Sequence, residues 1–148
     1  MSVTARPTVA NQQHAVARPV RNAIATVCIS GTLEDKLAAA SAAGFDGVEI
    51  FEPDLVGAPW SPAEVRSRCA DLGLSIDLYQ PFRDFDAGPP ELLAANLRRA
   101  ERKFDVMEQL GTDQVLVCSS VSPDALDDDD GIAEQLHLLA SKAGERGS

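Results

Sequence analysis

An arginine between two phenylalanines is the residue of this chain best suited to binding an anion. Arg83 lies in the segment 81–85, with the sequence PFRDF, directly after a short β-type run. The planar guanidinium of arginine matches a carboxylate or a phosphate, and here aromatic walls would flank the pair. The alternative is an arginine that anchors its own loop by pairing with Asp84 or Asp86. The segment therefore predicts either an anion-binding arginine or a loop anchor.

Two carboxylates occupy positions where a strand would point into the interior of a barrel. Glu49 and Asp77 alternate with apolar residues in the segments 47–51 and 74–79. The central strands of an open doubly wound sheet are buried on both faces and apolar throughout, so a barrel with a polar interior explains the carboxylates better. The alternative is a buried pair with an arginine or with backbone amides, which would only hold the barrel together. We expect that structural role for Asp77, near the start of its strand, and leave both roles open for Glu49.

The remaining chemistry-bearing residues form no recognisable catalytic pattern. His14 and His137 have no serine or cysteine partner of the kind that hydrolases use, and the chain has no glycine-rich phosphate loop. The four aspartates at 127–130 lack the alternating spacing and the distal glutamate of a calcium loop. We expect these acids at the start of a helix, where they favour the positive end of the helix dipole.

The elements that would position these residues recur as strand–helix units. Helix-period segments end in a small residue and a glycine, and the first three are followed by a β-type run. The closing glycines are Gly44, Gly73, Gly111 and Gly147. Glycine adopts the left-handed conformation that commonly ends a helix. Strands that alternate with helices predict a parallel sheet in an α/β fold. We expect four units, (βα)4, with the chain ending where a fifth strand would begin.

The pattern also gives bounds and faces for the elements. We expect strands at 24–29, 47–51, 74–79 and 114–118, and helices at 32–43, from Ser61–Pro62 onward, at 90–110 and after the aspartate run. In the third strand, Ile76 and Leu78 are expected to face the helices, while Asp77 and Tyr79 face the barrel interior. Chemistry in such barrels lies at the carboxyl ends of the strands.

Composition narrows the classes of partner. The chain has 148 residues, with 13 basic and 23 acidic side chains and a net charge of -10. An acidic surface repels nucleic acid and anionic membranes, so we expect neither as a partner and favour a small molecule. The three cysteines form no metal-type spacing and leave one thiol over, which predicts a reduced, cytoplasmic protein.

The first 23 residues differ from the rest of the chain. They contain no acidic residue, and Pro7 and Pro19 interrupt any apolar run, so we expect no secretory signal or membrane span. We predict a disordered tail at 1–23, with an organelle transit peptide as the alternative, and a folded domain at 24–148.

Three segments of the chain resemble the sugar phosphate isomerase/epimerase superfamily, whose fold is the xylose-isomerase-like TIM barrel. The segments are 44–52, 76–85 and 99–105. Within that superfamily, the segment 76–85 and the stretch 117–130 most resemble the bacterial metal-dependent 3-dehydroshikimate dehydratases. The resemblance covers about residues 24–147 and, on this pattern, only the N-terminal half of the barrel.

The resemblance implies a lyase that converts 3-dehydroshikimate to protocatechuate with a divalent ion (Mg, Mn or Co) that polarises the ketone. The metal ligands of the family are implied to follow Ser148, so no metal is expected on this chain. Substrate-binding positions are implied at Glu49, Glu52, Tyr79, Gln80, Arg83 and Lys103. Arg83 is expected to bind the carboxylate and Gln80 a ring hydroxyl. For Lys103, a solvated helix face is the preferred alternative.

Other interpretations stay open at this point. The substrate class is a hydroxylated cyclic carboxylate or a sugar, so another isomerase or epimerase of the superfamily fits as well. A half-barrel without activity of its own is a further alternative, and we expect no catalysis by this chain alone. The unpaired edges of the first and last strands predict self-association.

Overall fold

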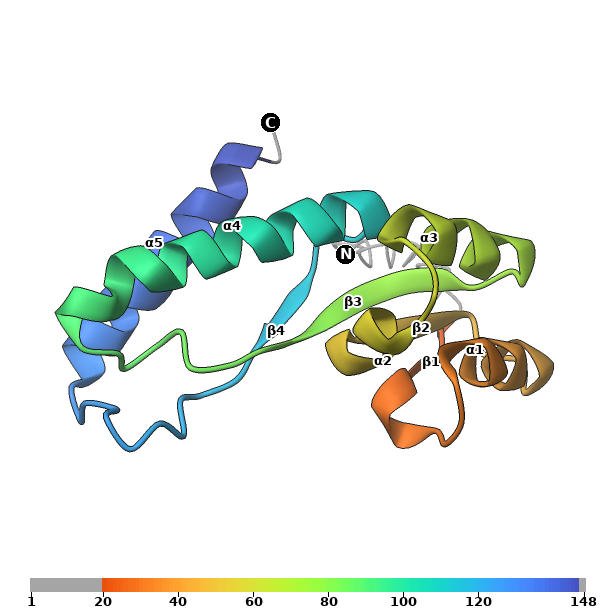
Figure 1. Ribbon diagram of the computed structural model, residues 1–148, viewed down its shortest axis with the longest axis horizontal. Coiled ribbons are helices and arrows are strands. Elements are labelled where there is room, and N and C mark those ends of the chain that lie inside the picture. The colour runs from red at the N-terminus through yellow and green to blue at the C-terminus, as the bar shows by residue number, and fades with distance from the viewer. Residues whose placement is uncertain (1–19, 147–148) are drawn as a thin grey trace, which may run out of the picture.

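The computed structural model describes residues 20–146 and contains one parallel sheet of four strands. The strands are β1 (Ala23–Ala25), β2 (Gly47–Phe51), β3 (Ser75–Phe82) and β4 (Val115–Val117), and each pairs with the next in chain order. Helices connect them, as Figure 1 shows. The predicted α/β class and the half-barrel are therefore confirmed.

Five α-helices and two 3₁₀ turns complete the described part of the chain. They are η1 (Thr26–Cys28), α1 (Leu33–Ala42), α2 (Glu52–Gly57), α3 (Pro62–Asp71), η2 (Pro90–Leu92), α4 (Leu93–Leu110) and α5 (Asp129–Arg146). Figure 1 shows α4 stretched along one side of the sheet, and Arg146 of α5 pairs with Asp105 of α4 at 2.5 Å. No sequence pattern predicted α2, which is a short helix immediately after β2.

Capping residues determine where α1 and α3 begin. Thr32 and Asp35 exchange hydrogen bonds as a capping box at the start of α1, and Ser61 and Glu64 do the same at the start of α3. Each box satisfies amide groups that a helix end leaves unpaired. The predicted starts of these two helices are confirmed.

The core lies between the sheet and the helices. Val48 and Ile50 of β2 are fully buried, and Leu37, Val65 and Phe104 join them from α1, α3 and α4. Burying a side chain of this size contributes about 1.5–3 kcal/mol. The apolar set of β2 therefore faces the helices, as its alternation predicted, and Glu49 lies on the other face.

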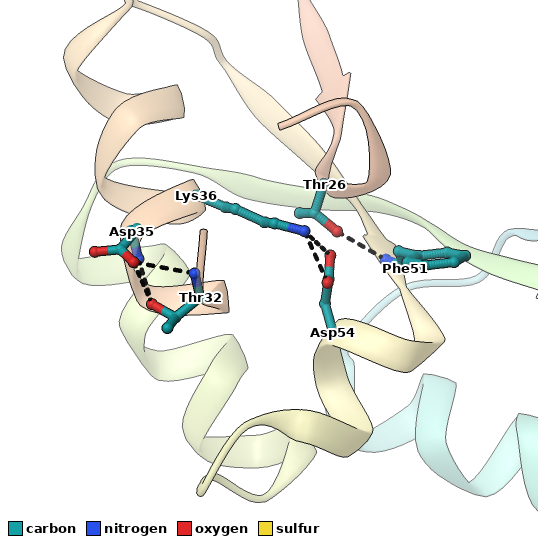
Figure 2. A network of polar contacts seen from close by, with 6 residues as sticks. All are labelled: Thr26, Thr32, Asp35, Lys36, Phe51 and Asp54. Carbon is teal, nitrogen blue, oxygen red and sulfur yellow. Dashed lines mark hydrogen bonds and ion pairs between the residues drawn. The ribbon is translucent and has the colours of Figure 1, made fainter. Parts of the chain in front are cut away.

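The first strand is shorter than the predicted segment 24–29. Its pairing with β2 ends at Ala25, and the chain then turns through η1, which leaves Val27 49% exposed. The buried hydroxyl of Thr26 accepts a hydrogen bond from the backbone N–H of Phe51 at 3.0 Å (Figure 2). A side-chain oxygen thus takes the place of a strand carbonyl and lets the ladder end early.

The predicted faces of β3 are wrong after Asp77. Val48 pairs with Ile76, but Glu49 pairs with Leu78, so Asp77 is an extra residue in the strand. One inserted residue moves every later side chain to the opposite face. Leu78 therefore shares the inner face with Glu49, while Tyr79 lies on the helix side opposite Ile50.

Residues before Ile24 take part in the fold. Arg21 donates to Ser75 and forms an ion pair with Asp77 at 3.3 Å. The backbone N–H of Asn22 donates to Asp46 at 2.8 Å. Asp77 thus pairs with an arginine as expected, but the pair is exposed rather than buried. Residues 21 and 22 belong to the folded unit. Residues 1–19 of the predicted tail lie outside the described residues.

A close approach between β2 and β3 explains the glycine at position 47 and gives a first prediction. A Cβ atom on Gly47 would lie 2.5 Å from a carboxylate oxygen of Asp77 and 2.6 Å from the Ser75 hydroxyl. We expect Gly47→Ala to lower the free energy of unfolding by about 1–3 kcal/mol, measured by urea denaturation. Gly57→Ala is the control, because nothing lies within 4 Å of its added Cβ. Equal midpoints for the two variants would contradict this packing.

No helix within the part of the chain described, residues 20–146, has both the length and the apolar character needed to cross a membrane.

Candidate functional site

The six predicted substrate-binding residues fall into three places. Glu49 and Gln80 lie on the inner face of the sheet. Glu52, Tyr79 and Lys103 meet on the helix side, and Arg83 follows the end of β3. The structure thus does not gather all six side chains in one pocket.

Glu49 and Gln80 form the polar pair of the inner face. Gln80 is opposite Phe51 in the register, which places it diagonally across from Glu49. Its amide Nε2 donates to Glu49 Oε2 at 2.7 Å. The carboxylate only accepts hydrogen bonds, so it fixes the amide with its nitrogen toward Glu49. The second carboxylate oxygen and the amide oxygen are acceptors suited to the hydroxyl groups of a ligand.

Glu52 joins α2, β3 and α4 on the helix side. Its Oε1 accepts from the Tyr79 hydroxyl at 2.8 Å and from Lys103 Nζ at 2.7 Å. Lys103 Nζ also lies 5.3 Å from the ring centres of both Tyr79 and Phe82. The solvated helix face preferred for Lys103 is therefore wrong, because the residue is only 9% exposed. Its charge is balanced by Glu52 and by two aromatic faces.

Two buried acids give a pH prediction. Burial raises the pKa of the Cys69 thiol from 9.0 to about 11, and burial, followed by the hydrogen bond and charge of Glu52, raises the pKa of the Tyr79 hydroxyl. The folded state holds these protons more tightly than the unfolded state. Its advantage is complete below the ordinary pKa values and is lost as pH rises through the folded ones.

We therefore expect the free energy of unfolding to fall as pH rises from about 9 to about 11. Urea denaturation across that range measures the slope, which Cys69→Ala and Tyr79→Phe should each reduce. A profile whose slope is the same in both variants and in the parent chain would contradict the assignment.

Arg83 extends from the β3–α4 segment, and its side chain is exposed. Within residues 20–146, neither Asp84 nor Asp86 forms an ion pair with it. The Asp84 carboxylate accepts hydrogen bonds from residues of the β4–α5 loop instead. The loop-anchor alternative is therefore not what the structure contains, and the guanidinium is available to a ligand.

A buried ion pair at the same end of the sheet was not anticipated from the sequence. Lys36 Nζ lies 2.8 Å from each carboxylate oxygen of Asp54, and the two side chains are 8% and 15% exposed (Figure 2). The pair ties α1 to α2 beside a cavity of about 390 Å³ that Asp54 helps to line. The available signal was the position of Lys36 between Leu33 and Ala40 on the apolar stripe of α1.

The described residues do not provide a metal centre. Among residues 20–146, no three His, Cys, Asp or Glu side chains group in a way that could hold a metal ion. On the inner face, the Glu49 carboxylate is joined by an amide rather than by a second carboxylate. Hard divalent ions require several oxygen ligands in fixed geometry, and this pair alone does not supply them.

Comparison with known proteins decides the family. The family model for the xylose isomerase-like TIM barrel matches residues 37–148. The chain belongs to this family. Two curated relatives, both 3-dehydroshikimate dehydratases, are 57% identical in Pseudomonas putida and 58% identical in Pseudomonas aeruginosa, each over 128 residues. These matches cover 86% of this chain and 20% of each relative, so the chain spans about a fifth of their length.

Two solved structures show how much of a longer chain this chain matches. A fusion of such a barrel with a 4-hydroxyphenylpyruvate dioxygenase superposes with a TM-score of 0.84 at 57% identity, over 86% of this chain and 20% of that one. The IolI protein, solved with a bound zinc atom, has a TM-score of 0.70 at 11% identity, over 85% of this chain and 47% of its own. The second likeness concerns the fold alone, and this chain matches about half of that protein.

Proposed function

We propose that this chain forms the first half of the barrel of a 3-dehydroshikimate dehydratase and contributes the inner face of its sheet to the substrate pocket. The 57% identity over 128 residues to the Pseudomonas putida dehydratase carries the proposal. The match spans a fifth of that relative, so dehydration is proposed as the activity of a whole protein of which this chain supplies one part.

Each of the predicted site residues has a role in the proposal. Arg83 binds the substrate carboxylate, because its exposed guanidinium is the planar donor that a carboxylate pairs with best. Gln80, held in place by Glu49, accepts a hydrogen bond from a ring hydroxyl. Glu52, Tyr79 and Lys103 support this arrangement from the helix side, where their mutual bonds hold α2 and α4 against β3.

The proposed reaction removes one molecule of water from the ring. A proton leaves the carbon next to the ketone, the hydroxyl group β to that ketone departs, and enolisation yields the aromatic ring of protocatechuate. A divalent ion (Mg, Mn or Co) is proposed for the whole protein, and among residues 20–146 no three His, Cys, Asp or Glu side chains group in a way that could hold it.

Partners and location follow the same proposal. The ligand is a small molecule, and the net charge of -10 opposes nucleic acid and anionic membranes. The three free cysteines favour the cytoplasm. The outer edges of β1 and β4 have no strand beside them within residues 20–146, so further strands, from the rest of the barrel or from a second copy, are proposed to add there.

A nuclear magnetic resonance titration of the chain with protocatechuate tests the proposed pocket. We expect the largest shift changes at the backbone amides of Glu49, Gln80 and Arg83 and at the guanidinium of Arg83. Glu101 of α4, which pairs with Arg146 of α5, serves as the reference position. Shift changes confined to the helix side, or absent altogether, would contradict the proposal.

A further inference from the structure

One arginine of α4 holds the chain segment that carries Arg83. Arg99 Nη2 donates to the backbone carbonyl of Arg83 at 2.7 Å, and Nη1 donates to the carbonyl of Asp84 at 3.1 Å. Nη1 also contacts Asn96 Oδ1 at 3.0 Å, and the guanidinium carbon lies 5.2 Å from the ring centre of Phe82. A rigid fork of donors thus fixes two successive carbonyl groups.

Asp84, the residue after Arg83, connects this segment to the β4–α5 loop. Asp84 has a φ of +53°, a left-handed conformation that costs a non-glycine residue about 1 kcal/mol or more. Its Oδ1 accepts from the Ser120 hydroxyl at 3.2 Å and from the backbone N–H of Val121 at 3.1 Å. The β3–α4 and β4–α5 loops are therefore joined through one carboxylate, and that carboxylate is oriented by the backbone that Arg99 holds.

Arg99 and Arg83 have different roles in the β3–α4 segment. The backbone of Arg83 is tied down by Arg99, while its side chain is exposed and has no hydrogen bond to residues 20–146. A binding group gains affinity when its position is fixed before the ligand arrives. We propose that Arg99 is a positioning residue. It fixes the backbone of Arg83 and, through Asp84, the β4–α5 loop in the conformation that binds an anionic ligand. The ligand part of this inference rests on the proposed function.

Amide hydrogen exchange on the chain tests the positioning directly. The N–H of Val121 donates to Asp84 Oδ1, and the residue is 80% exposed, so that bond is its main protection. We expect the Arg99→Met variant to speed exchange at Val121 by about tenfold and to increase backbone mobility at Arg83 and Asp84. Arg102→Met, an exposed arginine of the same helix, should leave both unchanged. Unchanged exchange and mobility in Arg99→Met would overturn the inference.

Ligand selectivity separates positioning from a general structural effect. The probes are protocatechuate and its methyl ester, which lacks the negative charge. Arg83→Met should abolish the preference for the acid, and Arg99→Met should reduce it by about fivefold or more, with no further loss in the double variant. Arg99→Lys keeps the charge but not the fork, so it should behave like Arg99→Met rather than like the parent chain.

The outcomes of this experiment are distinguishable. If Arg83→Met removes the preference and Arg99→Met does not, the positioning role is contradicted and the role of Arg83 stands. If the parent chain shows no preference, or Arg83→Met keeps it, the assignment of Arg83 to the carboxylate fails. The exchange and mobility measurements then decide the role of Arg99 in holding the loop.

Discussion

Arg83→Met should lower kcat/KM for 3-dehydroshikimate by about 10- to 100-fold in a barrel whose first half is this chain. Such a barrel is obtained by replacing the matching 128-residue segment of the Pseudomonas putida relative, which is 57% identical. A hydrogen bond to a charged group contributes about 1.5–3 kcal/mol, and the exposed position of Arg83 favours the lower part of that range. Steady-state kinetics measure the change, which should appear mainly in KM.

Two controls accompany this variant. Arg102→Met removes an exposed arginine of α4 and should leave kcat/KM within a factor of two. Arg83→Lys keeps the charge but loses the paired donors, so it should recover only part of the affinity. An Arg83→Met barrel with unaltered KM would show that another residue binds the carboxylate.

Lys36→Met should lower the free energy of unfolding by about 3 kcal/mol or more. Lys36 and Asp54 are 8% and 15% exposed, and the ammonium lies 2.8 Å from both carboxylate oxygens. Removing one partner of a buried pair leaves the other charge without compensation, which costs about 3–5 kcal/mol. Urea denaturation of the chain measures the difference.

The double variant Lys36→Met/Asp54→Leu separates the lost charge balance from lost packing. It removes both charges, so it should regain most of the stability lost in the single variant. Lys142→Met, which breaks the exposed pair with Glu145, is the matched surface control and should cost less than about 1 kcal/mol. Equal losses in Lys36→Met and Lys142→Met would contradict the buried character of the first pair.

Local signals carried most of the fold prediction. Thr32 with Asp35 and Ser61 with Pro62 are helix starts that depend only on neighbouring residues, and both are found where expected. The alternation of β2 also holds, because a regular strand repeats every two residues.

Contacts between distant residues account for the errors. The early end of β1 depends on the Thr26 hydroxyl meeting the N–H of Phe51, 25 positions later. The extra residue in β3 depends on Asp77 lying among Gly47, Ser75 and Arg21. The alternation of apolar and polar residues within a strand contains no information about these distant partners. The predicted faces of Leu78 and Tyr79 are therefore reversed in the structure.

The candidate site was predicted in part for the same reason. Glu49 lies on the inner face as its alternation predicted, whereas Gln80 was expected after the third strand and lies within it. Lys103 is buried beside the carboxylate of Glu52, which is 51 positions away in the sequence. Charged residues on a helix are usually solvated, and only the tertiary structure brings Glu52 and Tyr79 to this lysine. The anchoring role of Arg99 likewise becomes visible only when α4 packs beside the β3–α4 segment.

The most direct measurement of the central claim is dehydratase activity in the grafted barrel, in which this chain replaces the matching segment of the Pseudomonas putida relative. Protocatechuate is followed by its ultraviolet absorbance after 3-dehydroshikimate and Mg²⁺ or Mn²⁺ are added. The account predicts product formation within about tenfold of the parent relative, and its loss when Glu49, Gln80 and Arg83 are replaced together. A folded graft that forms no protocatechuate, or one that keeps its activity after those replacements, would contradict it.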